Sequence, residues 1–200
     1  SRAYIQREVY EDFVAALQQK AAKLAIGDPN EPGVYMGPVI DQEALKRFDQ
    51  AASDARSEGR IVIGGERITE GDFERGNFVQ PTAVEVPLES RLFKEELFLP
   101  FVALAPVDSV EEGLRLANDT PYGLTAGFYS EDQEEIDRFL SGIEAGVVYV
   151  NRRAGATTGA WPGVQPFGGW KGSGSSGKAG GGLYYTQLYL REQSQTVVEE

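Results

Sequence analysis

Two segments of the chain carry residues whose types and spacing could support chemistry. The first is the run Glu95-Glu96-Leu97-Phe98, which lies directly before an apolar stretch, residues 101–107, that indicates a strand. If that strand belongs to a parallel sheet, a carboxylate and an aromatic ring at the mouth of the sheet, just before the strand, could contact a ligand, because ligands bind at the ends of such strands. The alternative is an exposed acidic pair followed by a buried aromatic side chain, and the residues alone leave both open.

The second segment is rich in glycine, because residues 151–182 hold 11 of the 24 glycines of the chain. A loop this long in a regular domain is usually functional or disordered, and its aromatic and proline residues favour packing over disorder. We therefore expect it to form one wall of a ligand site. Within it, Gly159 and Ala160 could present two backbone N–H groups that suit a carboxylate, or they could belong to a plain turn.

Part of the same segment imitates a nucleotide-binding motif. Residues 172–177 match the dinucleotide fingerprint Gly-x-Gly-x-x-Gly by letters, and residues 172–178 nearly match a phosphate-binding loop, with Ala179 where serine or threonine is needed. Both motifs require a strand before them and a helix after them. The flanks here are Phe-Gly-Gly-Trp-Lys and Lys-Ala-Gly-Gly-Gly, so we interpret the run as a tight loop packed near a site.

The composition limits the chemistry further. The 200 residues include no cysteine and no histidine, so the chain supplies no thiolate or imidazole chemistry. We also expect no metal site in it. The formal net charge of −12 disfavours nucleic acid and anionic membranes as partners. No apolar run approaches the roughly 20 residues that span a bilayer.

Hydrophobic periodicity predicts alternating strands and helices. Apolar residues at three- and four-residue steps, from Phe13 to Leu24, predict the buried face of a helix over residues 10–24. Three further helices are predicted to begin at Asp41, at the capping box of Ser109 and Glu112, and at that of Ser130 and Gln133. Strands are predicted at residues 3–7, 61–63, 78–79, 83–86, 101–107, 124–129 and 146–150.

This alternation predicts an α/β fold, an open parallel sheet with helices on both faces, because parallel strands need right-handed crossovers. Residues 188–198 alternate weakly and include many polar side chains, which is typical of an exposed strand that pairs with a sheet edge elsewhere. We accordingly divide the chain into one domain over residues 1–183 and a C-terminal strand over residues 184–200.

Three ordered segments resemble the aldehyde dehydrogenase superfamily. They are Glu95-Glu96-Leu97-Phe98, Asn118-Asp119-Thr120-Pro121-Tyr122-Gly123-Leu124-Thr125-Ala126-Gly127 and Pro166-Phe167-Gly168-Gly169-Trp170-Lys171-Gly172-Ser173-Gly174. The resemblance spans essentially the whole chain, and three motifs in the right order are highly specific. Within the superfamily, the runs Tyr149-Val150-Asn151-Arg152, Thr158-Gly159-Ala160 and Gly163-Val164-Gln165-Pro166-Phe167-Gly168-Gly169 resemble the 1-pyrroline-5-carboxylate (L-glutamate γ-semialdehyde) dehydrogenases.

The resemblance implies an NAD-dependent oxidoreductase of proline degradation that oxidises L-glutamate γ-semialdehyde to L-glutamate. In that family a cysteine attacks the aldehyde, a hydride passes to NAD and a thioester is hydrolysed. The cysteine, the glutamate that acts as base and the NAD-binding domain all precede the segment that Ser1-Arg2 resembles. The chain is therefore expected to be part of a catalytic domain, inactive alone, with NAD bound mainly by a domain outside it.

Five residues take their expected roles from the resemblance. Glu96 matches the carboxylate that accepts hydrogen bonds from the nicotinamide ribose, and Phe98 matches the aromatic ring against the nicotinamide. Gly159 and Ala160 match the backbone pair that anchors the substrate α-carboxylate. Phe167 matches the ring that packs on the aliphatic part of the substrate.

Further expectations follow from the same resemblance. They are a small-molecule aldehyde substrate, a homo-oligomer assembled through the C-terminal strand, and a cytoplasmic location, or the mitochondrial matrix in a eukaryote. The family usually has glycine after Phe98, where this chain has Leu99, and Asn151 is expected to be structural. Two alternatives remain open: part of another NAD(P)-dependent aldehyde dehydrogenase, or a stand-alone, non-catalytic binding or assembly domain.

Overall fold

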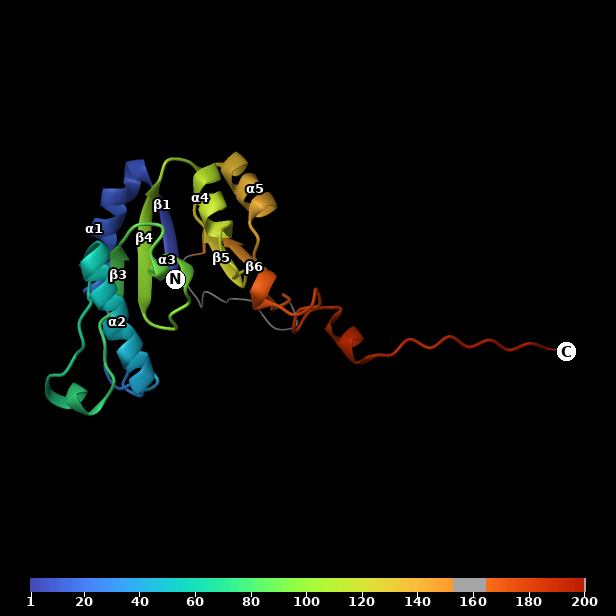
Figure 1. Ribbon diagram of the computed structural model, residues 1–200, viewed down its shortest axis with the longest axis horizontal. Coiled ribbons are helices and arrows are strands. Elements are labelled where there is room, and N and C mark those ends of the chain that lie inside the picture. The colour runs from blue at the N-terminus through green and yellow to red at the C-terminus, as the bar shows by residue number, and fades with distance from the viewer. Residues whose placement is uncertain (153–164, 200) are drawn as a thin grey trace. The chain divides into compact units, whose positions relative to one another are not determined.

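The computed structural model describes residues 1–152 and 165–199. The chain forms two compact units, which we call unit 1 (Ser1–Gly113) and unit 2 (Leu114–Glu200) and describe separately; Figure 1 labels their elements. Both units combine helices with parallel strands, so the predicted α/β class is confirmed. The domain boundary proposed between residues 183 and 184 stays a prediction.

Unit 1 is built on a four-stranded sheet in the order β1-β4-β3-β2. The strands are β1 (Arg2–Gln6), β2 (Arg60–Ile63), β3 (Thr82–Glu85) and β4 (Phe101–Val107). β4 pairs in parallel with both β1 and β3, whereas β2 pairs antiparallel with β3. The sheet is therefore mixed rather than wholly parallel, because no crossover helix separates β2 from β3 and the chain can return along the neighbouring strand.

Helices cover both faces of this sheet. Side chains of neighbouring residues on a strand point to opposite faces, and Ala103 and Leu104 of β4 accordingly belong to two different buried clusters. On the Leu104 face lies α1 (Tyr10–Ala21), which buries Tyr10 and Val14. Phe13, which periodicity assigns to the core, is 39% exposed, because the residues that face the sheet lie on the neighbouring stripe of the helix.

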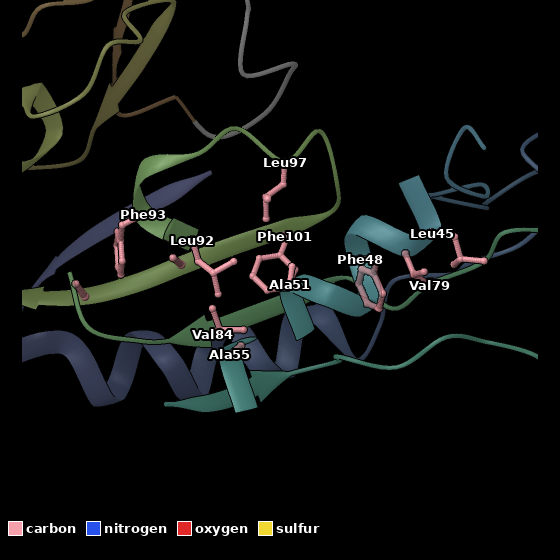
Figure 2. Packing of buried hydrophobic residues seen from close by; sticks show 12 residues of the cluster. Leu45, Phe48, Ala51, Ala55, Val79, Val84, Leu92, Phe93, Leu97 and Phe101 are labelled. Carbon is pink, nitrogen blue, oxygen red and sulfur yellow. The ribbon is translucent and has the colours of Figure 1, made fainter. Parts of the chain in front are cut away.

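The opposite face is covered by α2 (Gln42–Glu58). Asp41 caps this helix as predicted, its Oδ1 accepting a hydrogen bond of 2.7 Å from the Ala44 amide. Figure 2 shows the cluster, in which Phe48 meets Phe101 edge to face at 6.4 Å between ring centroids. Its buried members are Leu45, Phe48, Ala51, Ala55, Val79, Val84, Leu92, Phe93, Leu97, Phe101, Ala103 and Ala105.

Two further helices flank β4 in the sequence, one before it and one after it. The short helix α3 (Arg91–Lys94) directly precedes the Glu95-Glu96 pair. α4 (Val110–Asn118) begins at its predicted capping box, where Ser109 Oγ accepts a hydrogen bond of 3.1 Å from the Glu112 amide. Ser109 therefore satisfies a free N–H group in the first turn of α4, as Asp41 does for α2.

Unit 2 contains a parallel pair of strands, β5 (Thr125–Phe128) and β6 (Val147–Val150), joined through α5 (Gln133–Gly142). Phe139 of α5 stacks on Phe128 at 4.8 Å between ring centroids. The cap of α5 is Asp132 and not Ser130, because Asp132 Oδ1 accepts from two amides of the first turn. Short 3-10 helices span Arg7–Val9, Gly71–Arg75, Lys171–Ser173 and Tyr185–Tyr189.

The C-terminal segment differs from the predicted strand. Tyr185–Tyr189 forms a 3-10 helix, and residues 190–199 are exposed and pair with no described strand of the chain. Its role in an oligomer stays a prediction. Within residues 1–152 and 165–199, no helix has the length and apolar character that crossing a bilayer requires.

Candidate functional site

The run that carries Glu96 and Phe98 lies at the amino-terminal ends of β1 and β4 in the unit 1 sheet, which we call the amino edge. β1 and β4 are parallel neighbours, with Arg2 opposite Ala103, so both strands begin at this edge. The Ser1 amino group donates a hydrogen bond of 3.1 Å to the carbonyl oxygen of Phe101, the first residue of β4. These residues therefore lie at the amino-terminal ends of the parallel strands, opposite the carboxyl ends beyond which ligands usually bind such sheets.

The two adjacent glutamates have different surroundings. Arg91 donates a hydrogen bond of 3.1 Å from Nη1 to Glu95 Oε2. Glu96 is exposed and makes no hydrogen bond or ion pair with another described residue. It does lie close to Ser1: burial and the charge of Arg2 lower the pKa of the Ser1 amino group, and the Glu96 carboxylate opposes both. The Glu96 carboxylate is therefore free to accept hydrogen bonds from a ligand.

Phe98 extends from the same segment into solvent. Its side chain is 80% exposed, so the alternative of a buried aromatic is wrong. Its backbone φ is +54°, a conformation that costs on the order of 1–3 kcal/mol in a bulky residue and is typical of functional segments. Leu97 is buried and Leu99 packs against the same core, so the residues on either side anchor the exposed ring. In place of the usual glycine, Leu99 supplies one of these anchors.

A bidentate ion pair joins this segment to α2. The guanidinium of Arg91 binds Asp54 through both Nε and Nη2, each 2.6 Å from Oδ2. Burial lowers the pKa of Arg91, but the hydrogen bonds to Asp54 and Glu95 outweigh it, and the pKa lies above its ordinary value. Neither Arg91 nor Asp54 was predicted from the sequence. The available signal was the four-residue spacing of Arg91 and Glu95, at which helical ion pairs form.

At the opposite end of the sheet, where β1, β3 and β4 end and which we call the carboxyl edge, there is a cavity. It is lined by residues of the 3-10 helix Arg7–Val9, of α1 and β2, and of the ends of β3 and β4. Arg60 Nη2 binds Glu85 Oε1 at 2.8 Å across β2 and β3, and Arg7 pairs with Asp108. Tyr10 lies in the cavity wall, and only 6% of the residue is exposed. Among the described residues, its hydroxyl has no hydrogen-bond partner.

The electrostatics of this edge follow from these pairs. The hydrogen bond from Arg60 lowers the pKa of Glu85, burial opposes it, and the nearby Tyr10 hydroxyl lowers the pKa further. Burial raises the pKa of Tyr10, and the adjacent Glu85 charge adds to this effect. The hydroxyl is thus near Glu85 without the geometry of a hydrogen bond. Within the described residues, no group of three or more acidic side chains could hold a metal ion.

Of the three residues proposed to contact substrate, the structure describes one. Phe167 is 41% exposed, and its amide donates a hydrogen bond of 2.8 Å to Gly180 O in an antiparallel bridge. Gly159 and Ala160 lie outside the described residues. Phe167 belongs to unit 2, whereas Glu96 and Phe98 belong to unit 1, so each is placed within its own unit.

Asn151 has a structural role, as expected. It follows β6 with φ at +52°, a conformation that asparagine tolerates better than most residues. Its Oδ1 accepts from the Ser130 amide at 3.1 Å, and its Nδ2 donates to the Ser130 carbonyl at 2.8 Å. Both ends of the amide are therefore used to hold the turn after β5.

Two of the segments that carry the family resemblance dock on each other in unit 2. The Gly123 amide donates to Ser173 Oγ at 3.0 Å, and the Gly123 carbonyl accepts from Trp170 at 2.8 Å. Lys171 Nζ donates to the Asn118 carbonyl at 2.6 Å and pairs with Glu144 at 2.5 Å. We call this contact of residues 118–124 with residues 168–174 the interlock, and its polar groups are satisfied within the chain.

The run that imitates a dinucleotide fingerprint is part of the same tight loop. Lys171–Ser173 is a 3-10 helix, and no α-helix follows within the described residues. A Cβ atom added at Gly174 would lie 1.9 Å from the Gly169 carbonyl oxygen, so glycine is needed there for close packing of backbone. The run is therefore a tight loop that lacks the helix a nucleotide motif requires, and its nearness to a ligand site stays a prediction.

The chain is similar to known proteins along its whole length. The sequence profile of the aldehyde dehydrogenase family matches residues 1–194. The 1-pyrroline-5-carboxylate dehydrogenases of Bacillus cytotoxicus and Geobacillus kaustophilus are 40% and 38% identical to it over 200 residues. Those matches cover all of this chain and 37% of each relative, so the chain spans a little over a third of the length of these curated relatives.

Solved structures show the same likeness. A 1-pyrroline-5-carboxylate dehydrogenase from Thermus with bound NAD aligns at a TM-score of 0.85 and 37% identity, over 96% of this chain and 36% of that one. A betaine aldehyde dehydrogenase from Staphylococcus aureus in complex with NAD⁺ aligns at a TM-score of 0.77 and 28% identity, over 86% and 33%. The chain belongs to the aldehyde dehydrogenase family.

Proposed function

We propose that the chain forms part of the catalytic domain of an NAD-dependent 1-pyrroline-5-carboxylate dehydrogenase, which oxidises L-glutamate γ-semialdehyde to L-glutamate. The observation that carries the proposal is the amino edge of unit 1, where a Glu96 carboxylate with no partner among the described residues and an exposed Phe98 ring stand on one anchored segment. The 37–40% identity to 1-pyrroline-5-carboxylate dehydrogenases over the whole chain supports it.

The proposed roles follow the chemistry of the side chains. Glu96 would accept hydrogen bonds from the hydroxyl groups of the nicotinamide ribose, which are strong when the acceptor is charged. Phe98 would pack on the nicotinamide, which accepts the hydride when NAD is bound. Gly159 and Ala160 would donate backbone hydrogen bonds to the substrate α-carboxylate, and Phe167 would cover the methylene groups between the carboxylate and the aldehyde.

The chain would contribute to the reaction without its nucleophile. It contains no cysteine, so the attacking thiolate and most of the NAD-binding surface would come from residues outside it. We further propose that the C-terminal segment pairs with a neighbouring subunit of a homo-oligomer, and that the enzyme is located in the cytoplasm, or in the mitochondrial matrix of a eukaryote.

The substrate is tested in the full-length enzyme by comparing L-glutamate γ-semialdehyde with pentanal, which has the same chain length and no carboxylate. We expect NAD reduction with a kcat/KM at least about tenfold higher for the semialdehyde, because a hydrogen bond to a charged group contributes roughly 1.5–3 kcal/mol. Ala160→Pro removes one backbone donor and should reduce this preference.

The other outcomes each identify an alternative. Equal kcat/KM values for the two aldehydes would assign the chain to an aldehyde dehydrogenase with another substrate. Equal losses on both substrates in Ala160→Pro would remove the evidence for a carboxylate anchor at this position. Absence of NAD reduction with any aldehyde would favour a non-catalytic binding or assembly domain.

A further inference from the structure

The segment that carries Glu96 and Phe98 is held by two kinds of interaction. Leu92, Phe93 and Leu97 are 3%, 3% and 7% exposed and belong to the buried cluster that also contains residues of β4 (Figure 2). Hydrophobic burial is non-directional, so these contacts hold the segment against the sheet without setting the direction of the polar side chains between them. Directional contacts are needed to determine which of the two adjacent carboxylates stays free.

Those directional contacts come from Arg91. Its planar guanidinium contacts Asp54 Oδ2 through two nitrogens and Glu95 Oε2 through the third, an arrangement that fixes orientation as well as distance. The Arg91 and Asp54 side chains are only 34% and 18% exposed, so water competes less for this pair than for a surface ion pair.

The receiving carboxylate is itself fixed on α2. Gln50, one helical turn earlier, donates a hydrogen bond of 2.7 Å to the other oxygen, Asp54 Oδ1. Asp54 is followed by the fully buried Ala55 of the core cluster. A rigid helix therefore presents Asp54 to Arg91, and α2 is linked directly to the segment before β4.

The same geometry distinguishes the two glutamates. Arg91 and Glu95 are four residues apart on and just after α3, which brings their side chains together on one helix face. Glu96 is five residues from Arg91, outside the four-residue spacing of a helical pair, and makes no hydrogen bond or ion pair with another described residue. Because Glu95 is bound by Arg91, it is removed from the site, and Glu96 alone stays available.

We propose that Arg91, held by Asp54, is a positioning residue for the Glu96 carboxylate. The proposal rests on the function proposed above, in which Glu96 orients the nicotinamide ribose. Arg91 touches neither substrate nor cofactor and acts only through Glu96. Loss of Arg91 would release Glu95 to compete for the same space and allow the segment to rotate about its apolar anchors.

A double-mutant cycle in the full-length enzyme tests this coupling. Arg91→Met should slow single-turnover NADH formation about tenfold or more, since misplacement by about 1 Å can cost a hundredfold, with little change in the KM of the aldehyde. In the Glu96→Gln background the same substitution should slow it less than about twofold, because coupled residues are not additive. Equal effects of Arg91→Met in both backgrounds would overturn the proposal and leave Arg91 a structural residue.

Two further variants separate geometry from charge and from folding. Arg91→Lys keeps the charge but lacks the planar fork, so it should recover only part of the rate. Asp54→Asn should reproduce the loss seen in Arg91→Met, and it gives an independent measurement if Arg91→Met does not fold. Full activity of both variants would contradict the proposal.

Arg67→Met is the matched control. Arg67 also pairs with a carboxylate of α2, Asp49, through two nitrogens, at exposures of 42% and 43%, but its loop does not carry Glu96. It should lower the melting temperature about as much as Arg91→Met and leave the rate unchanged. If Glu96→Gln itself left the rate unchanged, the proposed role of Glu96 would fail; a slow Glu96→Gln with additive Arg91→Met would defeat the positioning role alone.

Discussion

The two edges of the unit 1 sheet use their charged side chains differently. At the carboxyl edge, Arg60 pairs with Glu85 and Arg7 pairs with Asp108 beside a cavity. At the amino edge, Glu96 pairs with no described residue, and the neighbouring Phe98 ring is 80% exposed. The hollow surface and the unused polar group therefore lie at opposite ends of the same strands.

The difference separates two criteria by which a ligand site could be sought in this fold. A charged group that is already paired binds a ligand weakly, because binding would first break the existing ion pair. A free carboxylate on an anchored segment can accept hydrogen bonds directly. Concave shape and position at the carboxyl ends of strands are the usual guides. Here both favour the edge whose charges are neutralised, and free hydrogen-bonding capacity favours the other.

The largest expected effect is the difference in rate between two variants, Glu96→Gln at the amino edge and Glu85→Gln at the carboxyl edge. Glu96→Gln should slow hydride transfer in the full-length enzyme about a hundredfold, because a reacting group misplaced by about 1 Å can lose that much. The free energy of unfolding should change by less than about 0.5 kcal/mol. Glu85→Gln should leave the rate unchanged and lower the stability. Stopped-flow measurement of NADH and urea unfolding give both quantities, and equal slowing by the two variants would abolish the distinction between the edges.

A smaller effect is expected from Tyr10→Phe at the carboxyl edge. The Tyr10 hydroxyl is buried without a hydrogen-bond partner among the described residues, which costs roughly 1–3 kcal/mol. Its removal at constant ring size should raise the free energy of unfolding at neutral pH by about 1 kcal/mol. A variant less stable than the wild type would show that the hydroxyl is satisfied in solution.

The same variant should also respond differently to alkali. The pKa of Tyr10 is raised above its ordinary value of 10.0, so the folded state retains a proton that the unfolded state releases above that pH. Below pH 10 the group causes no pH dependence of stability, and as the pH rises above that value the free energy of unfolding falls by up to about 1.4 kcal/mol per pH unit. Tyr10→Phe should lose this part of the slope in urea titrations at alkaline pH.

The smallest effect concerns the Arg60–Glu85 pair. The pKa of Glu85 lies below its ordinary value of 4.5, so the pair stabilises the fold at neutral pH, and this stability is lost as the pH falls below 4.5 through the folded-state pKa. Because Arg60 is 61% exposed, solvent screens the pair and we expect its contribution to stability to be small. Glu85→Gln should therefore converge with the wild type in acid, and a constant difference at all pH values would exclude an electrostatic cause.

The sequence was most informative where local signals decide the structure. The boundaries of β4 and the caps Asp41 and Ser109 were predicted correctly, because apolar alternation and capping chemistry act within a few residues. The predicted buried stripe of α1 was wrong at Phe13, because the packing of Tyr10 and Val14 against β1 and β4 determines which side of the helix faces the sheet.

The site was less predictable for the same reason. Glu95 and Glu96 are identical in type, and only the placement of Arg91 beside Asp54, 37 residues away along the chain, shows which carboxylate is bound within the protein. The positive φ of Phe98 depends on the anchoring of Leu97 and Leu99 and has no signal of its own in the sequence. The roles assigned to Glu96, Phe98 and Phe167 stay predictions.

The interlock has a consequence for how relatives of this chain are recognised. The hydrogen bonds of Gly123, Lys171 and Ser173 join the two segments of the interlock to each other. Their mutation would therefore weaken the fold, and would be selected against even in a descendant that no longer oxidised any aldehyde. Motifs of this kind record common ancestry and a shared way of folding. A survey that aims to separate working enzymes from inactive descendants would therefore gain more from the few exposed residues before β4 than from the longer and more conspicuous glycine-rich run.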